Sequence, residues 1–245
     1  MAQSDRGRIE LFYDFFGEDN VAETASTRNL GPFVVGGQGS EATDAGILTV
    51  ADALSGVGRI TSTDEAQHCT MVGTNTSFSP SLNGPIVLEA RVQFNNTATK
   101  MAYFGLSSID PDVLILEGGV GSVTAGTITN DADDLCGFAF SIEATATADW
   151  HMVYKGGSAS ESVAAASFLT GNTIVAGEWQ VLRLEIDTNG TARWYVDGDL
   201  KQTVVGAVST TEVQGVCLGV EAKGTNVEEM DVDYLLVQAN RDWTV

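Results

Sequence analysis

The 245 residues of this chain carry 33 acidic and only 12 basic side chains, which gives a formal net charge of −21. So strong an acidic excess leaves no useful basic patch for the phosphates of nucleic acids, and it disfavours binding to an anionic membrane surface. With 43% hydrophobic and 18% charged residues, the chain reads as globular and is long enough to bury a core without disulfides or metals.

Two features predict where the protein is made. The opening stretch MAQSDRGRIELFYDFF lacks the apolar segment behind a basic tip that marks a secretory signal, and no apolar run is long enough to span a membrane. The odd number of cysteines, Cys69, Cys136 and Cys217, indicates small core thiols in a reducing compartment rather than a disulfide framework. We therefore expect synthesis in the cytoplasm.

The first two thirds of the chain predict short β-strands. Residues 85–94 alternate most clearly, with Val87, Glu89, Arg91 and Gln93 on one face and apolar side chains on the other. The other strands expected in this part cover residues 8–16, 46–50, 57–63, 100–108, 134–144 and 149–157.

Residues 110–133 are rich in Gly and Asp and predict a long, elaborated loop with one helical turn near 113–116. No long segment of the chain shows a helical period, and no low-complexity linker divides it.

The last third gives the strongest pattern. In WQVLRLEID, Leu182, Leu184 and Ile186 share one face, while the residues between them are charged. A turn containing Gly190 and the strand ARWYVDG follow, then a further turn and LKQTVV, which together predict an antiparallel three-stranded meander. The segments GVCLGVEA and EEMDVDYLLVQAN add two more strands. We expect an N-terminal arm, residues 1–8, and one all-β domain, residues 9–245, built as a two-sheet sandwich.

The stretch WYVDG after an NG turn, followed by the closing acidic strand DVDYLLV, resembles the concanavalin A-like lectin/glucanase superfamily, and laminin-G-like domains in particular. The opening ELFYDFFGEDN is similar to the first strand of such domains. The resemblance implies an antiparallel jelly roll whose two ends lie near each other. This fold hosts lectins, hydrolases and purely structural modules, so it implies no single function.

The ends of the chain carry a second resemblance. SDRGRIELFYDFFGEDN at the start and VEAKGTNVEEMDVDYLLVQANRDWTV at the end look like proteins of tailed bacteriophages. That resemblance implies a component of the virion, and one that decorates the capsid.

Glu185 and Asp187 have the two-residue spacing of sugar-cleaving sites in this superfamily, where carboxylates work in pairs. The next position on the same face is Asn189, inside the turn, so the third carboxylate of the glucanase pattern is missing. We interpret the pair as a solvated strand face beside Arg183 and Arg193, and we expect no catalytic residues.

A second carboxylate row, Glu229, Asp231 and Asp233, alternates with Met230, Val232 and Tyr234, which we expect to point inward. The row is either a solvated face or, since its donors are all oxygens, a Ca²⁺ site. No other cofactor is expected.

Four tryptophans could stack on sugars. Trp194 falls on the apolar face of its strand and reads as a core residue. Trp150 and Trp243 are the better candidates for exposed rings that contact a carbohydrate.

These observations favour a non-enzymatic structural protein of a bacteriophage virion, which decorates and stabilises the capsid exterior after synthesis in the host cytoplasm. Its partners would be the major capsid protein or other virion proteins, and the sequence leaves a homo-oligomer and a bound glycan open. The arm, with Arg6 and Arg8 as a positive tip on an acidic body, is the expected capsid contact. The alternatives are a lectin-like carbohydrate-binding module and, third, a β-glucanase-type glycoside hydrolase.

Overall fold

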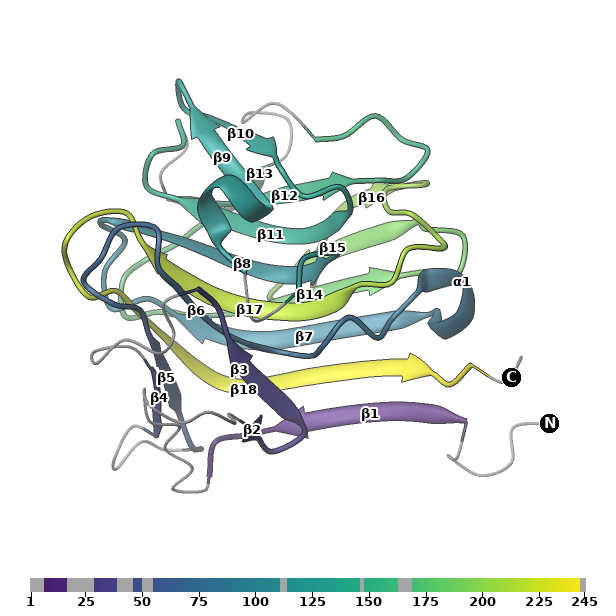
Figure 1. The fold of residues 1–245 in the computed structure, drawn as a ribbon, viewed down its shortest axis with the longest axis horizontal. Coiled ribbons are helices and arrows are strands. Elements are labelled where there is room, and N and C mark those ends of the chain that lie inside the picture. Colours follow the sequence, from purple (N-terminus) through teal and green to yellow (C-terminus); the bar gives the residue numbers. More distant parts are fainter. Residues whose placement is uncertain are drawn as a thin grey trace.

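The computed structural model describes residues 7–16, 29–38, 46–49, 55–110, 114–145, 148–162 and 169–242. Within them the chain forms two large antiparallel sheets and a separate two-stranded ribbon, as Figure 1 shows. The expected all-β sandwich is confirmed. None of the helical segments in these ranges is long or apolar enough to cross a bilayer.

Sheet A contains both the first and the last strand of the fold. Its long strand β18 (Glu229–Asn240) pairs with β7 on one side, and with β5 and β1 along different parts of the other side. The remaining strands of sheet A, in chain order, are β1 (Arg8–Tyr13), β4 (Gly46–Thr49), β5 (Gly58–Thr61), β7 (Ile86–Gln93), β14 (Trp179–Ile186), β15 (Ala192–Val196) and β16 (Asp199–Val204).

Sheet B has the order β13-β12-β11-β8-β17-β6-β3-β2. Its strands are β2 (Asn29–Leu30), β3 (Phe33–Gly36), β6 (Cys69–Gly73), β8 (Lys100–Ser107), β11 (Leu135–Ser141), β12 (Asp149–Lys155), β13 (Leu169–Thr173) and β17 (Gly215–Ala222). The ribbon is β9 (Gly121–Thr124) with β10 (Thr127–Asn130), and the two short helical segments are α1 (Pro80–Asn83) and η2 (Leu116–Val120).

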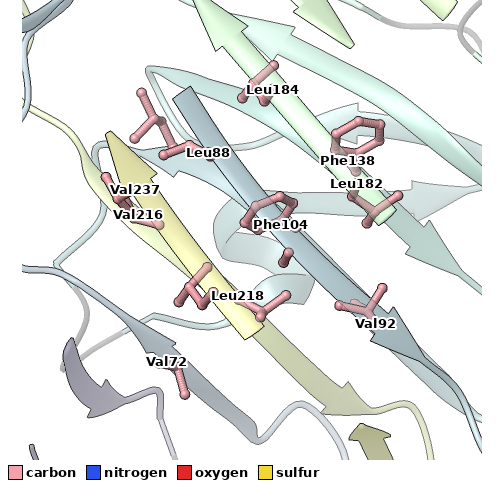
Figure 2. Close-up of a cluster of buried hydrophobic side chains, with 14 of the residues drawn as sticks. Val72, Leu88, Val92, Phe104, Phe138, Leu182, Leu184, Val216, Leu218 and Val237 are labelled. Atoms are coloured by element: carbon pink, nitrogen blue, oxygen red, sulfur yellow. The ribbon is translucent and has the colours of Figure 1, made fainter. Parts of the chain in front are cut away.

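The main core lies between the two sheets. Apolar side chains alternate inward along β7 and β14, and they meet the inner faces of β8, β11 and β17. Figure 2 shows Leu88, Val92 and Leu184 from sheet A gathered with Phe104 and Leu218 from sheet B. Trp194 is fully buried in this core, and its indole nitrogen donates to the carbonyl of Gly137, as the pattern of its strand predicted for a core residue.

Residues 114–132, which we call the cover, bury the outer face of sheet B. The cover contains η2, β9 and β10, and its apolar side chains pack on Met71, Met101, Tyr103 and Cys217. The central strands of sheet B are therefore buried on both faces along their whole length, whereas β7 and β14 of sheet A alternate between buried and half-exposed residues. The outer face of sheet A is accordingly the open one.

The region predicted as a loop is thus more ordered than expected. The helical turn comprises Leu116–Val120 rather than 113–116, and Val113 lies outside the described residues. The hairpin of β9 and β10 turns at Ala125 and Gly126, which both have positive φ. The sequence VTAGTIT, two β-prone runs joined by two residues, carried this signal.

All three cysteines are buried and free, as expected of core thiols. Cys136 lies in the main core, while Cys69 and Cys217 lie under the cover.

Candidate functional site

The centre of the open face of sheet A is occupied by charged and aromatic side chains. They come from outward positions of neighbouring strands: Arg183 on β14 lies opposite Glu89 on β7 and opposite Tyr195 on β15. Because β7 lies between β14 and β18, these residues also come close to Tyr234 on β18. The alternation of the strands places each side chain outward, and the strand order brings the side chains together.

Five of these side chains form a continuous hydrogen-bonded chain, which we call the polar network: Tyr195, Glu185, Arg183, Glu89 and Tyr234. The Arg183 guanidinium donates to Glu89 Oε2 at 3.0 Å and to Glu185 Oε1 at 2.7 and 2.9 Å. The Tyr195 hydroxyl donates to Glu185 Oε2 at 3.3 Å, and the Tyr234 hydroxyl donates to Glu89 Oε1 at 2.7 Å. The network crosses four strands.

The network is half-buried, and its hydrogen bonds determine which of its side chains carry a proton. The three charged side chains are 21–34% exposed. Burial opposes the charge of Arg183, but the hydrogen bonds that its guanidinium donates to Glu185 and Glu89 outweigh it and raise the pKa of the guanidinium. Burial and the neighbouring glutamates also raise the pKa of the Tyr195 and Tyr234 hydroxyls. Both tyrosines therefore stay protonated and remain hydrogen-bond donors at neutral pH.

Aromatic rings and further ion pairs flank the network. Arg91 pairs with Asp233 at 2.6 Å, and its guanidinium carbon lies 4.8 Å from the ring centroid of Trp179. On the other side of the network, Arg193 donates two hydrogen bonds to Asp187. The face thus offers fixed donors, fixed acceptors and half-exposed rings on a rigid sheet, which are the groups that hold a hydroxyl-rich ligand.

The structure places Glu185 and Asp187 beside arginines, as the pattern of the strand predicted. Both lie on the open strand face, Glu185 bonded to Arg183 and Asp187 to Arg193. Glu185 and Glu89 each direct their oxygens to Arg183 and to a tyrosine hydroxyl. In this arrangement the oxygens of both carboxylates are engaged by Arg183 and by a tyrosine hydroxyl.

The carboxylate row of β18 does not converge on a cation. Arg59 binds Asp231 at 2.7 and 3.0 Å and approaches Glu229 at 3.3 Å, whereas Asp233 turns to Arg91. Within the described ranges no group of three His, Cys, Asp or Glu side chains could hold a metal ion. Of the two interpretations of Glu229, Asp231 and Asp233, a solvated face or a Ca²⁺ site, these contacts favour the first, because Arg59 and Arg91 neutralise the row.

A bulge in β18 explains a second correction. The register between β18 and β7 shifts between Val232 and Tyr234. Met230 and Val232 point inward as expected, but after the shift Leu235 is the buried residue, and Tyr234 is only half-buried. Its hydroxyl consequently reaches Glu89 in the polar network.

Trp150, one of the two tryptophans predicted to contact a sugar, is not on this face. Trp150 is 1% exposed, packs among Phe94, Phe138 and Phe140, and donates its indole N–H to Gln180. It is a core residue, so the expectation of an exposed ring was wrong. Its strand β12 is buried on both faces. A ring in the middle of this strand would therefore be buried whichever face it pointed to. Trp243 lies outside the described residues.

The expected capsid contact is only partly described. Arg6 lies outside the described residues, and Arg8 is an exposed residue at the start of β1, where it pairs with Asn240. Arg8 therefore belongs to sheet A, one residue before the predicted boundary between arm and domain.

The sequence pattern could have suggested part of the site. The alternation of side chains along a strand places Glu89 and Arg91 outward on one strand, and Arg183 and Glu185 outward on another. It could not show that these two strands are neighbours, nor that Tyr234 joins them.

Comparison with known proteins shows the fold. No family model matches the sequence, and no curated protein is similar to it. Among solved structures, a protein of unknown function from Shewanella oneidensis MR-1 matches with a TM-score of 0.58 and 11% identity, over 100% of this chain and 92% of that one. A Bacillus licheniformis β-glucanase matches with a TM-score of 0.51 and 12% identity, over 93% and 97% of the two chains.

The carbohydrate recognition domain of Emp47p matches with a TM-score of 0.54 and 8% identity, over 91% of this chain and 96% of that one. At such identities the likeness concerns the fold alone. The chain has the concanavalin A-like jelly-roll fold that the WYVDG hairpin and the closing strand implied.

Proposed function

We propose that this protein is a non-catalytic, lectin-like carbohydrate-binding module that holds its ligand on the open face of sheet A. The observation that carries the proposal is the polar network, in which Arg183, two glutamates and two tyrosines are fixed relative to one another. Vicinal sugar hydroxyls can exchange hydrogen bonds with such planar charged groups, and Trp179 beside them offers a ring for the apolar face of a sugar. Solved carbohydrate-binding and carbohydrate-cleaving proteins of the same fold support this assignment.

The charges of the site favour a neutral glycan. The four arginines of the network and its flanks, Arg59, Arg91, Arg183 and Arg193, are each paired with a carboxylate, so this part of the face offers no uncompensated positive charge to an acidic sugar. The net charge of −21 repels anionic polysaccharides as well.

A glycan array followed by calorimetric titration tests the proposal. The wild-type protein should bind one or more neutral glycans, and Arg183→Met should weaken that binding by about 1.5–3 kcal/mol because charge-assisted hydrogen bonds are lost. Arg241→Met changes an exposed arginine outside the network and serves as the matched control. An array without a neutral ligand, or unchanged affinity in the Arg183 variant, would contradict the proposal.

The two other functions remain predictions. The role on a phage capsid rests on the ends of the chain and is tested through the arm, as argued in the Discussion. Hydrolysis is tested by incubating the protein with β-glucans: turnover that disappears in Glu185→Gln would make the open face an active site rather than a binding site.

A further inference from the structure

A straight row of outward side chains crosses sheet A and extends beyond the polar network. Arg183 on β14 lies opposite Glu89 on β7. Glu89 lies opposite Leu236 on β18, which in turn lies opposite Phe12 on β1. Directly opposite residues of antiparallel strands point to the same face of a sheet, so Phe12 shares the open face with the network. The row ends there, because β1 pairs with β18 and with no other described strand.

Phe12 brings a large, exposed ring to the end of this row. The residue is 49% exposed, and its ring centroid lies 6.2 Å from that of Tyr234, whose hydroxyl belongs to the network. Half-buried Leu236, two residues along β18 from Tyr234, completes a contiguous apolar strip from the network to the edge of the sheet. A single exposed apolar side chain needs no explanation, but an apolar strip beside ordered polar groups is typical of a ligand-binding site.

A fixed polar pair lies next to the Phe12 ring. Glu10 and Phe12 are alternate residues of β1, so they share the open face, and Glu10 lies opposite Gln238 on β18. The Gln238 amide donates to Glu10 Oε2 at 3.0 Å, and an amide nitrogen has a second N–H to offer. The edge of the sheet thus presents a ring with a fixed donor and a fixed acceptor beside it. The network and Trp179 present the same combination.

We propose that Phe12, with Glu10 and Gln238, forms an outer sugar subsite, and that the ligand of the open face is therefore a glycan chain rather than a single sugar. The inference rests on the proposed carbohydrate-binding function and adds the length of the ligand to it. A sugar bound at Arg183 lies three strands from Phe12, which is about 14 Å at the ordinary spacing of neighbouring strands. Only a ligand of several linked rings contacts both.

The chemistry of the subsite determines how a sugar binds there. The C–H face of a pyranose stacks on the Phe12 ring, while hydroxyls at its rim bond to the Gln238 amide and the Glu10 carboxylate. No described strand lies beyond β1, so a longer chain continues past Phe12 into solvent. The subsite therefore selects a minimum length of glycan and sets no maximum.

Calorimetric titration with neutral oligosaccharides of glucose, mannose and galactose, each from one to six units long, tests the inference. The same lengths of any other neutral sugar that binds on the array are included. Affinity should rise about tenfold between one unit and four units and then change little, because the outer ring and its hydrogen bonds are reached by then.

Phe12→Ala should lower the affinity for chains of four to six units about fivefold, because the stacking contact is lost. The affinity for one- and two-unit sugars should stay unchanged, since these ligands do not reach β1. Phe12→Tyr keeps an aromatic ring and should retain the full affinity for the longer chains.

Leu82→Ala is the matched control. Leu82 is 46% exposed on α1, outside sheet A, so the change removes a similarly exposed apolar side chain without touching the row. Equal losses in the two alanine variants, or equal affinity for one-unit and six-unit ligands in the wild-type protein, would overturn the inference. The second comparison requires no variant, so it decides the matter even if Phe12→Ala is unstable.

Arg183→Met separates a failure of this inference from a failure of the proposed function. If Arg183→Met weakens the binding of every ligand length and Phe12→Ala changes none, the network binds a sugar and the outer subsite alone is overturned. Absence of binding across the three series and the neutral glycans of the array would contradict both, because the outer subsite has no role without the network.

Discussion

Lys100 and Glu228 form an ion pair that is almost completely removed from solvent. The Lys100 ammonium lies 3.0 Å from Glu228 Oε2 and donates to the carbonyl of Glu229 at 2.9 Å, and the two side chains are 0% and 3% exposed. Burial lowers the pKa of Lys100, while Glu228 opposes the shift. The pair lies where β8 meets the start of β18, so it joins sheet B to sheet A.

Replacing one partner should be costly. In Lys100→Met the Glu228 carboxylate remains buried without its counter-charge, and we expect the free energy of unfolding to fall by about 3–5 kcal/mol in urea titrations. Adding Glu228→Gln should recover part of that loss.

Lys201→Met is the control for this prediction. Lys201 pairs at 3.6 Å with Asp199, whose side chain is 81% exposed, so the change should stay within about 0.5 kcal/mol. Equal losses in the two lysine variants would show that the buried pair contributes nothing specific.

The turn between β14 and β15 sets the register of the strands that carry the polar network. Gly190 has a φ of 76°, its N–H donates to the carbonyl of Asp187, and its carbonyl accepts the N–H of Ala207. An added Cβ would press against the carbonyl oxygen of Val208. Both the backbone conformation and the close approach therefore require glycine at this element.

Gly198, in the next turn, separates these two requirements. It has a φ of 85°, but an added Cβ there would meet nothing within 4 Å. Gly198→Ala should cost about 1 kcal/mol of unfolding free energy from backbone strain alone, whereas Gly190→Ala should cost about 3 kcal/mol because the clash is added. Chemical denaturation of the two variants measures the difference, and equal costs would contradict this account of the turn.

At the scale of the whole molecule, β1 and β18 join the beginning and the end of the described fold. Figure 1 shows them side by side, and the pairing continues from Arg8 opposite Asn240 to Tyr13 opposite Leu235. The carbonyl of Gly7 also accepts the N–H of Arg241. A truncation that tests the arm must therefore end before Gly7, and not at residue 8 as the sequence pattern suggested.

Deletion of residues 1–6 should leave the circular dichroism spectrum and the melting temperature unchanged, because it removes none of the described backbone pairs. If the protein decorates a capsid through its arm, the deletion should reduce the number of copies per assembled particle, most clearly at low salt, where the ion pairs of the wild-type arm are not screened. Copy number measured on particles decides this: full occupancy by the truncated protein would place the contact elsewhere.

The sequence by itself determined the class of the fold and the direction of many side chains. The period of two in β7, β14 and β15 fixes which residues are buried, since a strand turns successive side chains to opposite faces. The same local geometry placed Trp194 in the core and predicted that Glu185 and Asp187 lie beside arginines.

Only the tertiary structure decided which strands are neighbours, and the site depends on that. The polar network needs β7 between β14 and β18, a choice made by packing between segments far apart in the chain. Three further features cannot be seen in the local period: the bulge that turns Tyr234 outward, the pairing of Arg59 with Asp231, and the cover that buries the outer face of sheet B. Local sequence sets the direction of a side chain, whereas its partners depend on the free energy of the whole assembly of strands.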